Sequence, residues 1–204
     1  MDASSLFTEV RLVPVVTLVE PIHAVPLART LLSAGIKAIE VTLRTAGALS
    51  AIESIAREVP DILLGAGSVR HAGQFQQIKD AGCAFAVSPG STESLLDAAN
   101  MPYLPGAATA SEVLHLLERN YQLIKFFPAE VNGGITALKA ISQPVPEVRF
   151  CPTGGINATL APQYLQLEAV SCVGGSWFIS ADQLNAGNFV AIKASAEAAV
   201  SLCY

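Results

Sequence analysis

The sequence has few charged residues, no long apolar run and no cluster of positive charge, and these absences exclude several classes of protein. Charged residues make up 14% of the 204 residues, and the net charge is −5. The lysines and arginines are scattered, so the basic patch of a nucleic-acid-binding protein is missing. Mean hydropathy is high at +0.47, yet no apolar run approaches the roughly 18 to 20 residues that a membrane span requires. Residues 1–10 lack the basic start and apolar stretch of a signal peptide.

Closely spaced cysteine pairs are also missing. The four cysteines stand far apart, at Cys83, Cys151, Cys172 and Cys203, and no His or Cys cluster has the spacing of metal ligands. We therefore expect buried thiols in a cytoplasmic protein that uses no metal or other cofactor and binds neither nucleic acid nor a membrane. The content of 51% hydrophobic residues indicates a folded domain, and the high hydropathy indicates buried strands and a subunit interface.

The chain repeats one unit: a short apolar or β-branched run, a turn, and then an amphipathic helix. Helical patterns cover residues 24–34, 48–59, 110–119 and 189–202. Strand patterns cover residues 12–19, 38–42, 62–67, 85–88, 103–106, 123–127, 149–153 and 170–174. Eight such units predict a single (β/α)8 TIM barrel domain over residues 1–204, although a doubly wound open sheet would give a similar alternation.

Lys125 is the only one of five lysines with large apolar residues on both sides, in the run Leu-Ile-Lys-Phe-Phe. Burial disfavours the charged form of a lysine, and a neutral amine is a nucleophile that attacks carbonyl groups. A lysine on a solvated face, or one that extends to the surface, is the alternative interpretation.

Glu40 is a second unusual charge, because it interrupts the apolar strand at residues 38–42. Alternation places Glu40 and Thr42 on one face of that strand, which in a barrel points toward the axis. A carboxylate in that place is costly without a partner, and Arg44 and Lys125 are the two candidates. A purely structural ion pair is the alternative interpretation.

Paired glycines follow the seventh and eighth predicted strands, in Thr153-Gly154-Gly155-Ile156 and Gly174-Gly175-Ser176-Trp177. Phosphate is often held at this place in a TIM barrel. Glycine lets the backbone approach a ligand closely, and Ser176 adds a hydroxyl donor. Each pair on its own is also typical of a helix cap or a tight turn.

Six segments together resemble the 2-keto-3-deoxy-6-phosphogluconate (KDPG) aldolase and 4-hydroxy-2-oxoglutarate aldolase family, over nearly the whole chain. They are residues 40–45, 65–69, 88–90, 125–130, 151–156 and 174–177. The resemblance implies a class I lyase that cleaves KDPG to pyruvate and glyceraldehyde 3-phosphate in the Entner-Doudoroff pathway. It further implies a homotrimer that uses no metal.

The resemblance also implies a role for each matching residue. Lys125 would form a Schiff base with the 2-keto group, and Glu40 would move protons. The substrate carboxylate would be bound by Arg44, Ser68 and Pro89, and the 6-phosphate by the segments with Gly154, Gly155, Gly175 and Ser176. Ser68 stands where the family usually has threonine, and Thr153 matches the phosphogluconate branch rather than the phosphogalactonate branch.

The Schiff-base lyase is one of three functional hypotheses. A metal-free phosphosugar isomerase or epimerase would use the same phosphate loops but would not need a buried lysine. A phosphosugar-binding domain without activity would keep the glycines and would have no use for both Glu40 and Lys125. Within the lyase hypothesis, the sequence leaves open 2-keto-3-deoxy-6-phosphogalactonate and unphosphorylated 4-hydroxy-2-oxoglutarate as substrates.

Three further polar residues near the predicted strand ends have two interpretations each. Arg11 faces the substrate or lies in the loop before the first strand. His71 reaches the barrel mouth or, as we expect, lies on a surface loop. Glu130 supports the site or, as we expect, is a charge at a helix N-terminus.

Overall fold

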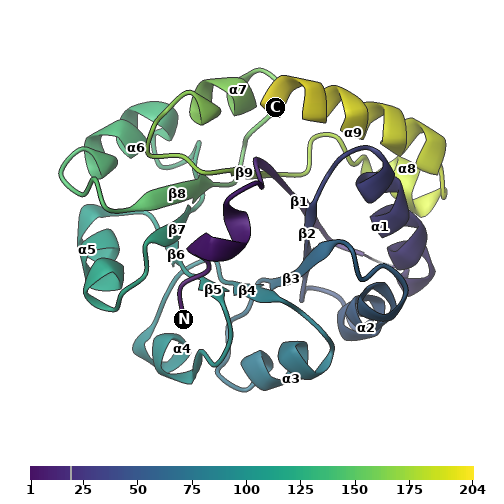
Figure 1. The fold of residues 1–204 in the computed structure, drawn as a ribbon, viewed down its shortest axis with the longest axis horizontal. Coiled ribbons are helices and arrows are strands. Elements are labelled where there is room, and N and C mark those ends of the chain that lie inside the picture. The colour runs from purple at the N-terminus through teal and green to yellow at the C-terminus, as the bar shows by residue number, and fades with distance from the viewer. Residues whose placement is uncertain (19) are drawn as a thin grey trace.

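The protein is an α/β fold in which short parallel strands are surrounded by helices (Figure 1). The computed structural model describes residues 1–18 and 20–204. The strands are β1 (Leu12–Val16), β2 (Ala38–Thr42), β3 (Leu63–Gly67), β4 (Phe85–Val87), β5 (Tyr103–Leu104), β6 (Gly106–Ala107), β7 (Leu123–Phe126), β8 (Arg149–Pro152) and β9 (Val173–Gly175). The strand predicted over residues 12–19 ends at Val16, and its predicted last residue, Val19, lies outside the described residues.

The helices lie outside the strands. They are α1 (Ala24–Ser33), α2 (Ala48–Glu58), α3 (Gln74–Asp80), α4 (Glu93–Ala98), α5 (Ala110–Glu118), α6 (Gly134–Ser142), α7 (Leu160–Leu165), α8 (Ala181–Asn185) and α9 (Phe189–Cys203), with short 3-10 helices η1 (Ser4–Phe7) and η2 (Pro21–His23). The four predicted helices correspond to α1, α2, α5 and α9 within one residue at each end. No helix in the described part of the chain combines the length and the apolar character that a membrane crossing needs.

Local chemistry explains where helices begin and end. Helix α1 stops at Gly35, which has a φ of +91°, and the amide of Ile36 donates to the carbonyl of Leu31 at 3.0 Å. This is the glycine-terminated end that the sequence predicts. Helix α5 begins with a capping box, in which Thr109 and Glu112 satisfy each other's backbone amides.

The strands form a curled parallel sheet in two parts. One part has the order β5-β4-β3-β2-β1-β9, and the other has the order β6-β7-β8. The predicted strand at residues 103–106 is in fact two strands, because Pro105 has no amide hydrogen to donate to the ladder. The predicted α/β class with parallel strands is therefore confirmed, while the predicted continuous fifth strand is wrong.

The last predicted strand also has different bounds. It was expected at residues 170–174, but β9 spans Val173–Gly175, and Val170 makes only an isolated bridge with Phe150. A second isolated bridge joins Thr153, after β8, to Gly174 in β9. Strand β8 therefore lies beside β9 although the two belong to different parts of the sheet.

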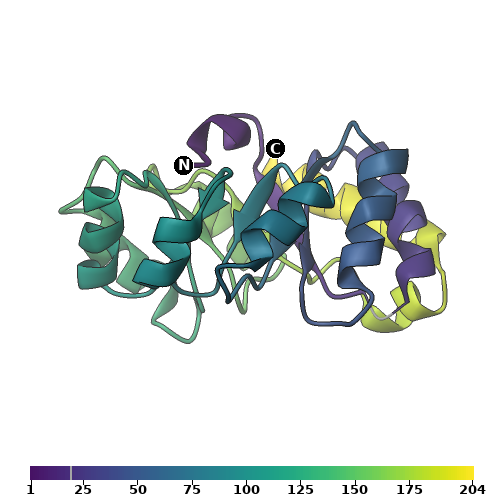
Figure 2. The same cartoon turned by 90° about the horizontal axis from the view of Figure 1, so that it is seen from below.

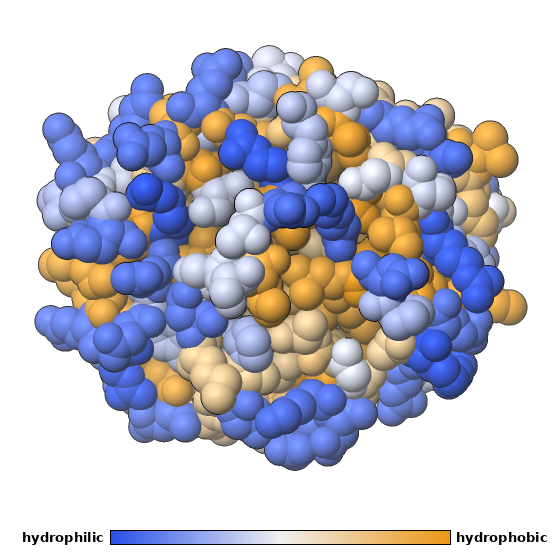
Figure 3. All heavy atoms as spheres, in the orientation of Figure 1, coloured by the Kyte–Doolittle hydropathy of each residue, from blue (hydrophilic) through white to orange (hydrophobic). Residues whose placement is uncertain are grey.

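The N-terminal segment covers the end of the sheet at which the strands begin. Figure 2 shows η1 outside the layer of strands and helices, and Phe7 packs against Phe85 with ring centroids 5.0 Å apart. The carboxylate of Asp2 accepts hydrogen bonds from the amides of Ser4, Gln122 and Leu123 at 2.9 to 3.0 Å. Figure 3 shows hydrophobic residues among hydrophilic ones on the face toward which η1 projects. The carboxyl ends of the strands, where barrel enzymes place their sites, lie on the other side.

Candidate active site

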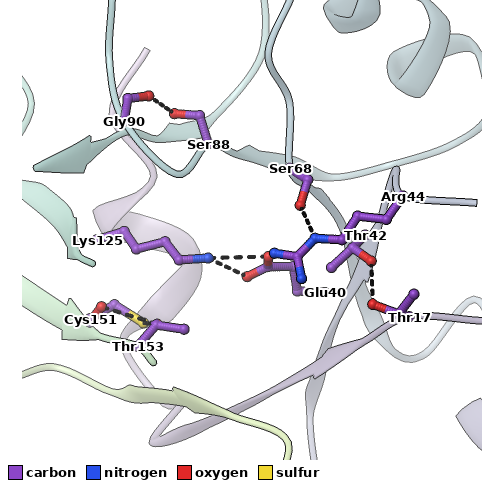
Figure 4. A network of polar contacts seen from close by, with 10 residues as sticks. All are labelled: Thr17, Glu40, Thr42, Arg44, Ser68, Ser88, Gly90, Lys125, Cys151 and Thr153. Atoms are coloured by element: carbon purple, nitrogen blue, oxygen red, sulfur yellow. Dashed lines mark hydrogen bonds and ion pairs between the residues drawn. The ribbon is translucent and has the colours of Figure 1, made fainter. Parts of the chain in front are cut away.

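Lys125 and Glu40 form a buried ion pair between β7 and β2 (Figure 4). The Lys125 Nζ lies 3.2 Å from Glu40 Oε1 and 3.3 Å from Oε2, and the two residues are only 4% and 3% exposed. The Phe127 ring lies close to the same amine, with its centroid 5.4 Å from Nζ. The predicted inward direction of Glu40 is confirmed, and of its two candidate partners Lys125 is the one that pairs with it.

Glycine makes room for this pair. A Cβ added at Gly67, the last residue of β3, would lie 2.0 Å from Glu40 Oε1, which is far inside a normal contact distance. Strands β2 and β3 run side by side, with Thr42 opposite Gly67. Thr42, on the same face as Glu40, is fully buried and shares a hydrogen bond of 2.8 Å with Thr17. The position of the carboxylate therefore depends on the absence of a side chain in the neighbouring strand.

Arg44, the other predicted partner of Glu40, instead contacts Ser68. Its Nε donates to Ser68 Oγ at 2.8 Å, and the guanidinium is largely exposed just after β2. Ser68 is buried directly after β3 and has a φ of +59°, an uncommon conformation outside glycine. The structure thus brings together Arg44 and Ser68, two of the three residues predicted to bind a carboxylate.

Two of the cavities at this end of the strands share Arg44 and Phe127. The first, of about 320 Å³, is lined by Arg44, Ser68 and Pro89 together with Arg70 and Phe127. The second, of about 160 Å³, is lined mainly by residues 153–156, Gly175 and Ser176. A larger depression of about 470 Å³ lies at the opposite end of β8. We assign the site to the two cavities that share Phe127, because this residue adjoins the buried pair, whereas the larger depression lies at the other end of the strands.

In the loop after β8, the paired glycines adopt backbone conformations with positive φ. Gly154 and Gly155 have φ values of +102° and +80°, and a Cβ at Gly174 would lie 2.2 Å from Thr153 Oγ1. A Cβ at Gly155, however, would be directed at the side chain of Glu130, 2.7 Å from its Cβ. A side chain at this position would therefore displace the loop rather than fill the cavity.

Buried hydroxyl groups of Ser88 and Tyr103 stabilise the backbone around Pro89. Ser88 Oγ donates to the carbonyl of Gly90 at 2.6 Å and lies 2.5 Å from the hydroxyl of Tyr103. A Cβ at Gly106 would lie 2.4 Å from the Pro89 carbonyl oxygen. Pro89 itself is exposed at the cavity wall.

The four cysteines are buried and free, as expected. Cys151 lies in register with Lys125 on the neighbouring strand β8. Its thiol is 3.9 Å from Thr153 Oγ1. A hydrogen bond with Cys151, together with burial, raises the pKa of Cys172 well above its ordinary value, so that this thiol stays protonated.

The structure shows the surroundings of Arg11, His71 and Glu130, for which the sequence allowed two interpretations each. The guanidinium of Arg11 reaches the carbonyl of Leu165 at 3.3 Å, at the start of β1 and away from the site. His71 is exposed on a surface loop, as expected. Glu130 accepts a hydrogen bond of 2.5 Å from the hydroxyl of Tyr164, and a Cβ at Gly134, the first residue of α6, would lie 3.0 Å from its Oε1.

The sequence interpretation missed Arg70 and Phe127, which line the site, and Tyr164, which lies behind it. Phe127 lines both cavities, and strand alternation from Lys125 could have placed it on the same face. Tyr164 lies on a short helix 34 positions after Glu130, and no sequence pattern links the two.

The chain matches a known protein family over almost its whole length. The sequence model of the family described as "KDPG and KHG aldolase" matches residues 3–195. The KHG/KDPG aldolase of Escherichia coli K12 is 46% identical over 202 residues, which are 98% of this chain and 95% of that protein.

Two solved structures are also similar. A Legionella pneumophila KDPG aldolase, with pyruvate captured at low pH as a covalent carbinolamine intermediate, has a TM-score of 0.94 and 42% identity and covers 98% of both chains. A Zymomonas mobilis KDPG aldolase with 3-phosphoglycerate has a TM-score of 0.91 and 41% identity, and covers 97% of this chain and 94% of that one. The chain therefore belongs to the KDPG and KHG aldolase family.

Proposed function

We propose that this protein is a Schiff-base aldolase that cleaves KDPG to pyruvate and glyceraldehyde 3-phosphate. The observation that carries the proposal is the buried Lys125 amine, 3.2 and 3.3 Å from the two Glu40 oxygens at the carboxyl end of parallel strands. The pyruvate captured covalently in the Legionella pneumophila relative supports the same chemistry here.

Lys125 acts as the nucleophile. Its amine and one proton, together the ammonium of the ion pair, combine with the C2 ketone and release water. The product is an iminium that accepts the electron pair of the breaking bond between C3 and C4. The carboxylate of Glu40, in contact with this amine, removes the proton of the C4 hydroxyl, directly or through water. Glyceraldehyde 3-phosphate leaves, and a pyruvate enamine remains on Lys125.

Glu40 then works in the opposite direction. It returns a proton to the enamine carbon, and water hydrolyses the resulting imine to release pyruvate. One carboxylate serves both steps because it alternates between base and acid. The burial of Glu40 supports this role. A site that excludes bulk water limits protonation of the enamine by solvent, so that the proton comes from Glu40.

Arg44 and Ser68 bind the substrate carboxylate next to the backbone at Pro89. The guanidinium offers two parallel donors to a carboxylate, and the bond from its Nε to Ser68 Oγ at 2.8 Å limits its orientation. Phe127 lines this cavity and lies next to the Lys125 amine. Binding the carboxylate in the cavity therefore turns the neighbouring ketone toward Lys125.

The second cavity holds the phosphate end. The backbone of Gly154 and Gly155, the strand end at Gly175 and the hydroxyls of Thr153 and Ser176 surround it. The positive φ values of the two loop glycines support a backbone that turns amide groups toward an anion. The Zymomonas mobilis relative holds 3-phosphoglycerate, a phosphorylated three-carbon acid, which supports a phosphate site in this family.

The whole chain, residues 1–204, folds as one closed (β/α)8 barrel. The isolated bridge between Thr153 and Gly174 and the single residue, Pro105, between β5 and β6 support a continuous ring. The barrel assembles as a homotrimer in the cytoplasm; the high mean hydropathy of +0.47 supports a subunit interface.

Unphosphorylated 4-hydroxy-2-oxoglutarate is a second substrate. The family and the Escherichia coli relative carry both substrates in their names. Both compounds present the same 2-keto acid to Lys125, and they differ at the end that the second cavity receives.

A coupled assay of pyruvate release from KDPG tests the proposal. The wild-type protein and a Lys139→Ala variant, which loses an exposed lysine, should cleave KDPG at similar rates. The Lys125→Ala variant should release no pyruvate above background. Cleavage by Lys125→Ala at the wild-type rate would refute the Schiff-base mechanism, and no cleavage by the wild-type protein would refute the activity.

A further inference from the structure

Glu130 and Tyr164 form a hydrogen-bonded pair directly behind the Gly154–Gly155 loop. The Tyr164 hydroxyl donates to Glu130 Oε1 at 2.5 Å, and Tyr164 is fully buried on α7. Burial raises the pKa of the Tyr164 phenol, and the neighbouring Glu130 carboxylate raises it further, so the phenol remains a donor at neutral pH. Neither residue lines the cavity that we assign to phosphate.

The main chain at Glu130 holds the loop from one side. After β7 and β8 end, the amide of Ala129 donates to the carbonyl of Thr153 at 2.8 Å, and the amide of Glu130 donates to the carbonyl of Gly154 at 3.1 Å. These two bonds continue the pairing of β7 with β8 into the loops. The strand that carries Lys125 is therefore connected directly to the glycine loop.

The side chain of Glu130 supports the next residue of the loop. A Cβ at Gly155 would lie 2.7 Å from Glu130 Cβ and 2.8 Å from Glu130 Cγ, so the stem of Glu130 packs against the α-carbon of Gly155. The hydrogen bond from Tyr164 fixes the far end of the same side chain. Glu130 is thus held at its carboxylate and contacts the loop with its backbone and its methylene groups.

The charge of Glu130 argues against direct contact with a phosphate. Two anions at close range repel each other, and a carboxylate on the cavity wall would oppose the ligand. Its place behind the loop, bound to a phenol, avoids this contact.

We propose that Glu130 and Tyr164 are positioning residues that hold the Gly154–Gly155 loop in the conformation that binds the phosphate group of the substrate. The inference rests on the proposed function and assigns to this pair the affinity for the phosphorylated end. Without the hydrogen bond, Glu130 is free to change its rotamer, and the loop loses the packing that fixes Gly155. The Lys125–Glu40 pair lies in the strands and keeps its geometry.

Two disruptive variants and one conservative variant test the inference. Tyr164→Phe removes the donor, Glu130→Ala removes the acceptor and the stem, and Glu130→Gln keeps the stem and an oxygen that accepts from Tyr164. Tyr121→Phe is the matched control, because it removes a phenolic hydroxyl from a ring that packs beside Tyr103 in the core, near the start of β7.

The measurements are kcat and KM for KDPG and for 4-hydroxy-2-oxoglutarate, and competitive inhibition by inorganic phosphate. Tyr164→Phe and Glu130→Ala should each raise the KM for KDPG and the inhibition constant of phosphate about tenfold, the effect of losing about one hydrogen bond. The KM for 4-hydroxy-2-oxoglutarate should change less than about twofold. Glu130→Gln should restore most of the affinity for KDPG.

The outcomes separate the inference from the function beneath it. Equal changes for both substrates, or no change for either, in variants that circular dichroism shows to be folded would overturn the inference. If Tyr164→Phe does not fold, the comparison of Glu130→Ala with Glu130→Gln decides by the same criterion. If the wild-type protein cleaves neither substrate, the proposed function fails, and the inference fails with it.

Discussion

Replacing Gly67 by alanine should separate Glu40 from Lys125 while adding a single methyl group. The new Cβ would lie 2.0 Å from Glu40 Oε1, whereas ordinary contacts begin at 3.4 Å. The carboxylate must therefore retreat by about 1.4 Å, and a misplacement of about 1 Å can cost on the order of 100-fold in rate. We expect the rate of KDPG cleavage to fall by at least that factor.

The chemistry predicts which steps are lost. Imine formation depends on the Lys125 amine, which the substitution does not touch, so pyruvate should still be trapped by borohydride. Proton exchange at the pyruvate methyl group depends on Glu40 and should fall in parallel with cleavage. Stopped-flow cleavage assays and exchange of the methyl protons in deuterated water, followed by NMR, measure the two effects.

Gly73→Ala is the matched control, because a Cβ at Gly73 meets no atom within 4 Å and the residue has a φ of −65°. It should leave both rates unchanged. Thermal unfolding followed by circular dichroism shows whether each variant is folded. A folded Gly67→Ala variant with the rates of Gly73→Ala would refute the argument that the space at Gly67 sets the position of Glu40.

Three further predictions concern the base, the loop and the N-terminus. Glu40→Gln should keep imine formation and reduce cleavage by roughly 10² to 10⁴-fold; wild-type cleavage and exchange rates would show that Glu40 is structural. Gly155→Val forces a β-branched residue to a φ of +80° and into Glu130, so kcat/KM should fall much more for KDPG than for 4-hydroxy-2-oxoglutarate; equal losses in a folded variant would contradict this. Burial raises the pKa of Asp2, but hydrogen bonds from Ser4, Leu123 and Gln122 lower it more, to a net value below its ordinary 3.8. Its contribution to stability is therefore present above about pH 4 and is lost as the pH falls through the lower, folded-state pKa. Asp2→Asn should destabilise the protein by about 1 kcal/mol at pH 7, and in urea titrations the difference should shrink at pH 3; a difference that is the same at both pH values would refute the assignment.

The parts of the fold that could be predicted depend on local patterns. Alternation within a strand identified β2 and the inward direction of Glu40, because side chains change faces at every residue. The glycine at position 35 predicted the end of α1, because its positive φ suits the turn. The break at Pro105 also had a local signal, the missing amide hydrogen, and reading residues 103–106 as one strand overlooked it.

The parts that could not be predicted depend on contacts between distant segments. The sequence left two possible cationic partners for Glu40. Only the three-dimensional packing shows that Glu40 pairs with Lys125, whereas Arg44 donates to Ser68. The contact between Gly155 and Glu130 likewise joins two loops that are far apart in sequence, so no local pattern shows what a side chain at Gly155 would meet. Tyr164 has no local feature that marks it as the partner of Glu130.

The central claim is that Lys125 is the nucleophile, and the most direct measurement is to locate the covalent adduct. The protein is incubated with pyruvate, reduced with borohydride, digested, and analysed by mass spectrometry. We predict that the added mass of a reduced pyruvate imine lies on the peptide that contains Lys125 and on that residue alone. An adduct on Lys37, Lys79, Lys139 or Lys193 in place of Lys125, or no adduct on an active protein, would contradict the mechanism.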